Sequence, residues 1–265
     1  MKCYEIMQKL ESLSPKQYAL EWDNVGLLVG DKEQDVRKIL VTLDVTESVV
    51  DQAISLGADM IVSHHPMIFS KLKRITAETA VGRKILKLSA NGICCYAMHT
   101  NFDVKGGMSE LMAKYLGIDT CEILEETAEN EGIGRIGTLL NSDGSEYTVR
   151  ELAELVKERF SLPNVFVYGD LEKKVRRIAL SPGSGKSMFG IAAEKKADVL
   201  ISGDFGHHEG LDAIEAGIGI IDATHAGVER IFIDYVADYL QQQLADCSIQ
   251  IEKVDVSRTI PVVVL

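Results

Sequence analysis

Residues Asp59–Pro66 read DMIVSHHP and join a short apolar, β-branched run to two adjacent histidines. The run follows a helical pattern that closes at Gly57, so it predicts a buried parallel strand. Pro66 prevents the strand from continuing, which leaves His64 and His65 at its carboxyl end, where open α/β sheets build their sites. Neighbouring side chains of an extended segment point to opposite sides, so the two imidazoles suit two metal ions better than one. The stretch is the first indication of a dinuclear centre.

Composition limits the class of protein. The chain has 265 residues, enough for one large domain or two small ones with an ample core. Its 28 basic and 40 acidic side chains give a net charge of −12, which argues against general nucleic-acid binding. The five cysteines form no C-x-x-C pair and are odd in number, which favours a reducing compartment over a disulfide framework. With no apolar signal core and no run of about 20 apolar residues, the sequence indicates a soluble, cytoplasmic protein without membrane contact.

The order of the predicted elements is typical of an α/β protein. Apolar runs at 36–44, 59–62 and 93–98 predict strands, and helical patterns at 46–56 and 77–90 predict the helices between them. A series of strand, helix, strand, helix and strand implies mostly parallel strands joined by right-handed crossovers.

The second part of the chain repeats the first. Residues 36–65 and 175–204 align without a gap at a constant offset of 139, with eight identities among thirty positions. The apolar positions of the predicted strands correspond as well. This indicates an internal duplication, in which two α/β halves with mostly parallel sheets flanked by helices share one metal cleft.

We therefore expect three regions along the chain. Residues 1–120 form the first α/β half, 121–170 form a connecting region without a large inserted domain, and 171–265 form the second α/β half. Within the connecting region, residues 133–140 resemble a strand and 148–160 a helix.

Each half also carries a His-x-x-x-acid motif after its last predicted strand, at His99–Asp103 and at His225–Glu229. His225 and Glu229 lie four residues apart at the start of a long helical pattern, 226–245, so they share one helix face and can reach a common ion. Asp103 adds a further oxygen ligand. Imidazole and carboxylate ligands without thiolate suit zinc, iron, manganese, cobalt or nickel, and the sequence does not rank these metals.

Two other stretches admit both a functional and a structural interpretation. Trp22, the only tryptophan, lies in a segment that is typical of a turn. We favour packing of its ring on the core over contact of its ring with a substrate. The glycine-rich residues 181–187 lack the spacing of a phosphate-binding loop, because Leu180 stands where that motif needs glycine. We interpret them as a turn between a strand and a helix.

Five motifs together resemble one protein family. They are WDNVG at 22–26, SHHP at 63–66, HTNFD at 99–103, Gly203-Asp204 with His208, and HAGVE at 225–229. In this combination the chain resembles the NGG-one-interacting-factor-three-like family, whose bacterial members are labelled type-two GTP cyclohydrolase I homologues. The resemblance covers nearly the whole chain. It implies a duplicated α/β fold, a dinuclear metal centre and a ring-shaped homohexamer whose sites face an internal cavity.

The resemblance also implies a set of ligands for two divalent metal ions per subunit, which in this sequence are His64, His65, Asp103, His225 and Glu229. Two further histidines, His99 and His208, match family positions near the metals. We consider them either as catalytic groups that protonate the leaving group or as residues that orient the ligands.

Roles inside the centre can be assigned as expectations. His64 with Asp103 would hold one ion and His65 with His225 the other, because the paired histidines diverge. Glu229 is the expected bridge, since a carboxylate has two oxygens and the ions of two-metal sites lie roughly 3.5–4 Å apart.

The expected function is metal-dependent hydrolysis of a small molecule by a metal-activated water, cyclohydrolase-like as the family label suggests. The alternative is a non-catalytic ring that stores or delivers metal, or an interaction scaffold, because membership in a fold family is analogy. An anionic or nucleotide substrate needs local cations on so acidic a chain. Lys71, Lys73 and Arg74 are the candidates, unless they form only a solvated loop.

Overall fold

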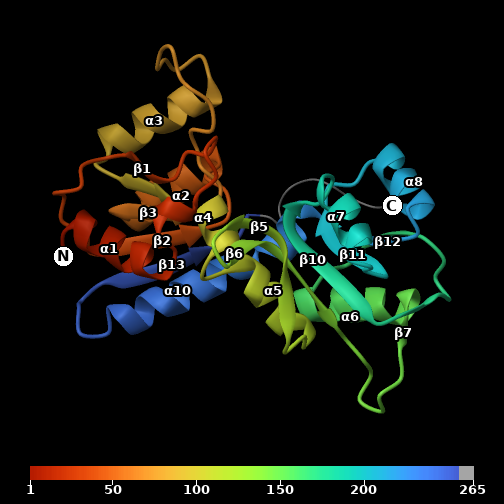
Figure 1. Ribbon diagram of the computed structural model, residues 1–265. Coiled ribbons are helices and arrows are strands. Elements are labelled where there is room, and N and C mark those ends of the chain that lie inside the picture. The colour runs from red at the N-terminus through yellow and green to blue at the C-terminus, as the bar shows by residue number, and fades with distance from the viewer. Residues whose placement is uncertain (257–265) are drawn as a thin grey trace. The chain divides into compact units, whose positions relative to one another are not determined.

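The computed structural model describes residues 1–256, and the chain divides into two compact units. The first unit contains Met1–Lys105 and residues 232–256, and the second contains Gly106–Ile231. Each unit is an α/β structure built on one main sheet (Figure 1). The sequence-based ranges place residues 171–265 in the second half, whereas residues 232–256 belong to the first unit, and residues 257–265 lie outside the described residues.

The first unit has a five-stranded sheet in the order β1-β4-β3-β2-β13, parallel except for β1 at its edge. Its elements are α1 (Cys3–Leu13), η1 (Lys16–Tyr18), β1 (Gly26–Val29), β2 (Lys38–Thr42), α2 (Glu47–Leu56), β3 (Met60–Ser63), α3 (Ala80–Ala90), β4 (Cys94–Ala97), α4 (Thr100–Val104), α10 (Ile231–Gln243) and β13 (Gln250–Val254).

Helices cover both faces of the first sheet. The helices α2 and α3 lie on one face and α1 and α10 on the other (Figure 1). On the α2 side, Leu40, Ile61 and Cys95 from three adjacent strands are buried in one cluster with residues of both helices. On the other side, the hydroxyl of Tyr239 in α10 donates to the backbone oxygen of Lys9 in α1 at 2.8 Å. The strands are therefore buried on both faces, as parallel strands usually are.

The second unit has a six-stranded sheet in the order β5-β6-β10-β11-β12-β8. Its elements are α5 (Met108–Leu116), β5 (Cys121–Ala128), β6 (Glu131–Thr138), β7 (Tyr147–Thr148), α6 (Val149–Phe160), β8 (Phe166–Tyr168), β9 (Lys174–Val175), β10 (Arg177–Ser184), α7 (Met188–Glu194), β11 (Val199–Gly203), α8 (His207–Glu215), β12 (Gly219–Asp222) and α9 (His225–Glu229).

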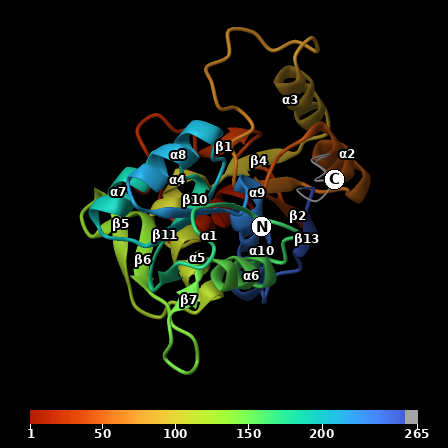
Figure 2. The same cartoon turned by 90° about the vertical axis from the view of Figure 1, so that its right-hand side faces the viewer.

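This second sheet is mixed and not mostly parallel. Only β10, β11 and β12 run parallel, while β5, β6 and β8 pair antiparallel with their neighbours. These three antiparallel strands come from the region expected to connect the halves, so residues 121–170 form part of the sheet. The helices α7 and α8 lie on one face of it and α5 and α6 on the other (Figure 2).

The duplication is visible in the strand register. Ile39 pairs with Met60 in the first unit, and Ile178 pairs with Val199 in the second, at the offset of 139 found in the sequence. The three parallel strands with two intervening helices are β2-α2-β3-α3-β4 in one unit and β10-α7-β11-α8-β12 in the other. The predicted strand and helix series is therefore confirmed in both units.

Local signals in the sequence set the ends of several helices. The Thr148 hydroxyl accepts from the Glu151 amide at 3.1 Å while the Glu151 carboxylate accepts from the Thr148 amide, a capping box that begins α6. Gly57 ends α2 with a φ of 65°, a conformation that costs glycine little.

One predicted helix is broken. The pattern at 226–245 forms α9 (His225–Glu229) and α10 (Ile231–Gln243), which meet at Arg230. The unit boundary also falls here, between Ile231 and Phe232. Among the helices of residues 1–256, none is both long and apolar enough to cross a membrane.

Candidate metal centre

The strand β3 delivers His64 and His65 to the end of the first sheet. The His64 and His65 amides donate to the Thr42 and Leu43 oxygens at 3.3 and 3.0 Å, which continues the contact with β2 beyond the strand. The Ser63 hydroxyl donates to the His65 backbone oxygen at 2.9 Å and stabilises the turn. The predicted placement of the paired histidines after a buried strand is confirmed.

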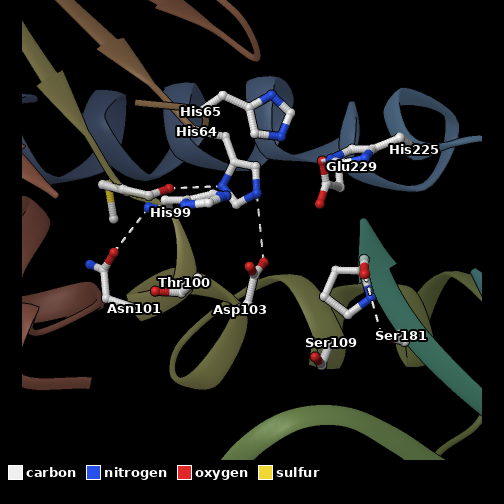
Figure 3. Close-up of polar contacts among 12 residues, drawn as sticks. His64, His65, His99, Thr100, Asn101, Asp103, Ser109, Ser181, His225 and Glu229 are labelled. Atoms are coloured by element: carbon white, nitrogen blue, oxygen red, sulfur yellow. Dashed lines mark hydrogen bonds and ion pairs between the residues drawn. The ribbon is translucent and has the colours of Figure 1, made fainter. Parts of the chain in front are cut away.

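His64 is fully buried and its ring orientation is fixed by the backbone. Its Nδ1 lies 2.8 Å from the Met98 carbonyl oxygen. A carbonyl only accepts, so Nδ1 carries the proton and Nε2 keeps the lone pair that binds metals. Nε2 faces Asp103 Oδ1 at 3.6 Å, too long for a hydrogen bond (Figure 3). Two ligands of one tetrahedral ion lie about 3.3–3.5 Å apart, so this pair fits a shared metal.

The ring of His65 is oriented by a carboxylate. Its Nδ1 lies 2.8 Å from Asp44 Oδ1, in the loop that follows β2. An ionised carboxylate accepts from Nδ1–H and leaves Nε2 as the ligand atom, the arrangement in which proteins commonly hold metal-binding imidazoles. The sequence interpretation did not identify Asp44.

His99 lies beside the paired histidines in the first unit. One ligand atom from each of His64, His65 and His99 lies within 4.8 Å of the others. The His99 ring stands edge-on to the His64 and His65 rings, at centroid distances of 5.3 and 5.6 Å. The structure thus brings His99 together with the paired histidines.

Asp23 orients His99 and is itself buried. Its Oδ1 lies 2.9 Å from His99 Nδ1, and its Oδ2 accepts from the Thr100 amide at 3.0 Å and the Thr100 hydroxyl at 2.5 Å. Burial alone would raise the pKa of Asp23, but the hydrogen bonds from His99 and Thr100 outweigh it and lower the pKa to about 2. Asp23 is therefore an anion at neutral pH that fixes the ring and the start of α4.

The second unit presents a histidine and a carboxylate from α9. His225 Nε2 lies 3.1 Å from Glu229 Oε2, one helical turn away, as the i,i+4 spacing predicted. Glu229 is buried, and Nδ1 of His225 lies 2.8 Å from Asp204 Oδ2. His225 and Glu229 are arranged like His64 and Asp103 of the first unit, because in each pair the imidazole is oriented through Nδ1 and the carboxylate lies near Nε2.

Strained backbone surrounds this second pair. Thr224, which precedes His225, has a φ of 61° and a ψ of 153°, a region that almost only glycine adopts. Asp204 also has a positive φ, of 63°. The Asp222 carboxylate accepts from the Thr224 amide at 2.8 Å and from the Phe205 amide at 2.9 Å. Asp222 thus holds in place the two loops that carry His225 and Asp204, and burial raises its pKa.

The two units are not equivalent at every ligand. The Met98 amide donates to Ser63 and the Ala223 amide to Ser202, so Met98 and Ala223 occupy the same position in the duplicated fold. By this register His99 corresponds to Thr224, and His225 follows one residue later. The two His-x-x-x-acid motifs are therefore displaced by one residue relative to each other.

His208 belongs to the second unit. It lies at the exposed start of α8, where its ring stands edge-on to His207 at 5.3 Å. Among residues 1–256, no group of three possible metal ligands includes it. Trp22 also differs from expectation, because it is 59% exposed and does not pack in the core.

Comparison with known proteins identifies the family of this chain. The sequence matches the family model of Duf34/NIF3 (NGG1p interacting factor 3) over residues 1–260. The chain belongs to this family. The resemblance drawn from the five motifs is thereby confirmed, and so is the α/β fold with two sheets flanked by helices.

Several known proteins are similar to this one over most of the chain. A Lactococcus lactis protein named GTP cyclohydrolase 1 type 2 homolog is 39% identical over 245 residues, covering 91% of this chain and 92% of its own. A Clostridium perfringens protein of the same name is 37% identical over 247 residues, covering 92% and 93%. The crystal structure of a Bacillus cereus protein related to NIF3 superposes with a TM-score of 0.93, at 28% identity and with 100% and 99% of the chains covered.

Proposed function

We propose that this Duf34/NIF3 protein binds two divalent metal ions per subunit and hydrolyses a small molecule with them. The observation that supports the proposal is that four histidines have the same ring orientation. Each turns Nδ1 toward an oxygen acceptor at 2.8–2.9 Å and so presents Nε2 as a ligand atom; they are His64, His65, His99 and His225. When bound, such ions activate water and stabilise developing negative charge.

The proposed ligands are the five expected from the sequence. His64 and Asp103 would hold one ion, which the 3.6 Å separation of their ligand atoms supports. His65 and His225 would hold the other, and Glu229 would bridge the two with its two oxygens. Imidazole and carboxylate atoms suit zinc, iron, manganese, cobalt or nickel equally on these grounds.

His99 is the proposed proton donor to the leaving group. Its imidazole lies beside the paired histidines, and Asp23 fixes the orientation of its ring. A histidine can donate and accept protons near neutral pH, which suits this role. The same role for His208 stays a prediction from the sequence.

The substrate class follows from the relatives and from charge. Two relatives are named GTP cyclohydrolase 1 type 2 homolog, so opening of a purine ring is the first reaction to test. The exposed cations Lys71, Lys73 and Arg74 follow the paired histidines in the chain and would offset the net charge of −12 for an anionic or nucleotide substrate.

The test is to load the purified protein with each candidate metal and screen nucleotides, phosphoesters and cyclic amides for turnover. Turnover should be lost in His65→Ala and kept in His207→Ala, which replaces an exposed histidine outside the candidate ligands. Full metal occupancy without turnover of any of these classes would instead support the storage, delivery or scaffold role.

Assembly and location are also part of the proposal. Membership in the family supports a homohexamer, which sedimentation at micromolar concentration would test, and a monomeric mass would refute it. All five cysteines are free thiols, which supports a reducing compartment such as the cytoplasm.

A further inference from the structure

Two exposed aromatic rings lie side by side on the first unit. Trp22 is 59% exposed and Phe69 is 60% exposed, and their ring centroids are 5.7 Å apart with an angle of 52° between the planes. Large aromatic side chains usually bury most of their surface, so a pair left open in contact with each other marks a place where something binds.

Hydrogen bonds of the neighbouring residues hold the segments that carry the two rings. The side-chain amide of Asn24 donates to the Ile68 backbone oxygen at 2.6 Å, which joins the Trp22 turn to the Phe69 loop. The Asp23 carboxylate accepts from its neighbour Asn24 and from Thr100. Both rings are therefore carried by segments that are held to each other and to the start of α4, and they form a preformed surface.

The aromatic pair stands next to the histidines. Trp22 and Phe69 each stand edge-on to the His99 ring, at centroid distances of 6.0 and 6.4 Å. His99 in turn lies within reach of the ligand atoms of His64 and His65. A molecule stacked on the two rings would extend from the aromatic surface to the proposed site of chemistry.

The Phe69 loop also supplies positive charge. Lys71, Lys73 and Arg74 follow the ring within five residues and are all exposed. Figure 2 shows this segment (orange) as a loop that extends away from the sheet before it reaches α3. On a chain with a net charge of −12, three exposed cations in one short loop make this a place where an anionic ligand is favoured.

We infer that Trp22 and Phe69 form a stacking surface for a planar heteroaromatic ring whose anionic group is held by the cations of the 71–74 loop. The inference rests on the proposed function and names its substrate class, nucleotide-like anions. Stacking on aromatic side chains tolerates different rings, since each has a π-face, and contributes about 1–3 kcal/mol per base. The surface would thus select for a ring with an anion, and the histidines would act on the end of the molecule that reaches them.

Trp22 is the only tryptophan, so its fluorescence reports on this surface alone. Full-length protein is titrated with guanosine 5′-monophosphate, guanosine and ribose 5-phosphate, once loaded with metal and once stripped of it. The nucleotide should quench Trp22 with the lowest Kd, guanosine should quench with a higher one, and ribose 5-phosphate should leave the emission unchanged.

Two variants separate the ring from the anion. Phe69→Leu should raise the Kd of the nucleotide about fivefold or more, as loss of one stacking partner predicts, while Phe166→Leu, which replaces an exposed ring in β8, should leave it unchanged. Lys71→Ala with Lys73→Ala should raise the Kd of the nucleotide and flatten its salt dependence without changing that of guanosine. Both sites are exposed, so circular dichroism should show folded protein.

Three results would overturn the inference. The first is that the nucleotide does not quench Trp22, and the second is that Phe69→Leu and Phe166→Leu change the Kd of the nucleotide equally. The third is that dilution of ligand-free protein changes both the Trp22 emission and the mass of the particle. The last would mean that a second copy covers the rings. Binding needs no turnover, so quenching that persists in a protein without hydrolase activity would count against the proposed reaction and leave the stacking surface in place.

Discussion

Asp59 and Asp198 make the same contacts in the two units. Asp59 Oδ2 accepts from the amides of residues 37 and 38 at 2.7 and 2.9 Å, and Asp198 Oδ2 accepts from those of residues 176 and 177 at 2.9 Å each. Both carboxylates lie just before the central strand of the duplicated series and bind the start of the preceding strand. The capping of the neighbouring strand in both units gives a structural reason for this identity, one of the eight between residues 36–65 and 175–204.

The first prediction follows from this pair. Asp59→Ala and Asp198→Ala each leave two backbone N–H groups without their carboxylate and should each destabilise the protein by about 1–2 kcal/mol. Hydrogen exchange should accelerate around β2 and β3 in the first variant and around β10 and β11 in the second. Asp51→Ala, which removes an exposed ion pair with Lys87, should stay within about 0.5 kcal/mol. Equal exchange changes in both units for either variant would contradict the independent capping roles.

A second prediction concerns the carboxylates that orient the imidazoles. Asp44→Ala and Asp204→Ala leave the proposed ligands in place but remove the acceptor of His65 Nδ1 or His225 Nδ1. Because the ring then loses its fixed tautomer and orientation, metal affinity should fall about 10- to 100-fold. Competition with a chelator measures it, and Asp119→Ala, at an exposed position, is the control. Unchanged affinity in both variants would show that the carboxylates do not act on the metals.

Periodicity and motif spacing predicted much of this fold and site. Parallel strands covered by helices on both faces are encoded as apolar runs, such as residues 60–62. Gly57 before this run and Pro66 after it mark where the strand begins and ends. The spacing of His225 and Glu229 alone placed both on one helix face, and the structure confirms it at 3.1 Å. These signals are local, so a single sequence contains them.

The features that the sequence did not predict depend on contacts between residues that are far apart in the chain. Asp23 and His99 are 76 residues apart, and no local pattern marks their 2.9 Å contact. The β13 strand pairs with β2 although more than 200 positions separate them, so no local pattern indicates that residues 250–254 join the sheet of the first unit. Trp22 was expected in the core because tryptophan is usually buried, and a binding surface is where that tendency fails.

The third prediction tests how closely β10 packs on the second pair of ligands. A Cβ at Gly183 would lie 2.9 Å from Glu229 Oε1 and 3.4 Å from His225, and the φ of 59° there already disfavours other residues. Gly183→Ala should therefore displace the carboxylate and lower metal affinity. Gly190→Ala, in α7 with open space around it, should leave affinity unchanged and stabilise the helix by up to about 1 kcal/mol. Equal affinities for the two variants would show that Glu229 adapts or binds no metal.

The last prediction distinguishes the proposed bridge from a ligand of one ion. Glu229 is buried and carries two oxygens, whereas His64 offers the single atom Nε2, because its Nδ1 lies against the Met98 carbonyl. Glu229→Ala should then lower the occupancy of both metals, and His64→Ala should weaken mainly one. Metal per subunit, measured by elemental analysis after equilibration with a limiting chelator, separates the two outcomes, with His207→Ala as the control that keeps full occupancy. Equal losses of metal in the Glu229 and His64 variants would refute the bridge, because removal of a carboxylate that binds one ion should lower the metal content no more than removal of an imidazole that binds one ion.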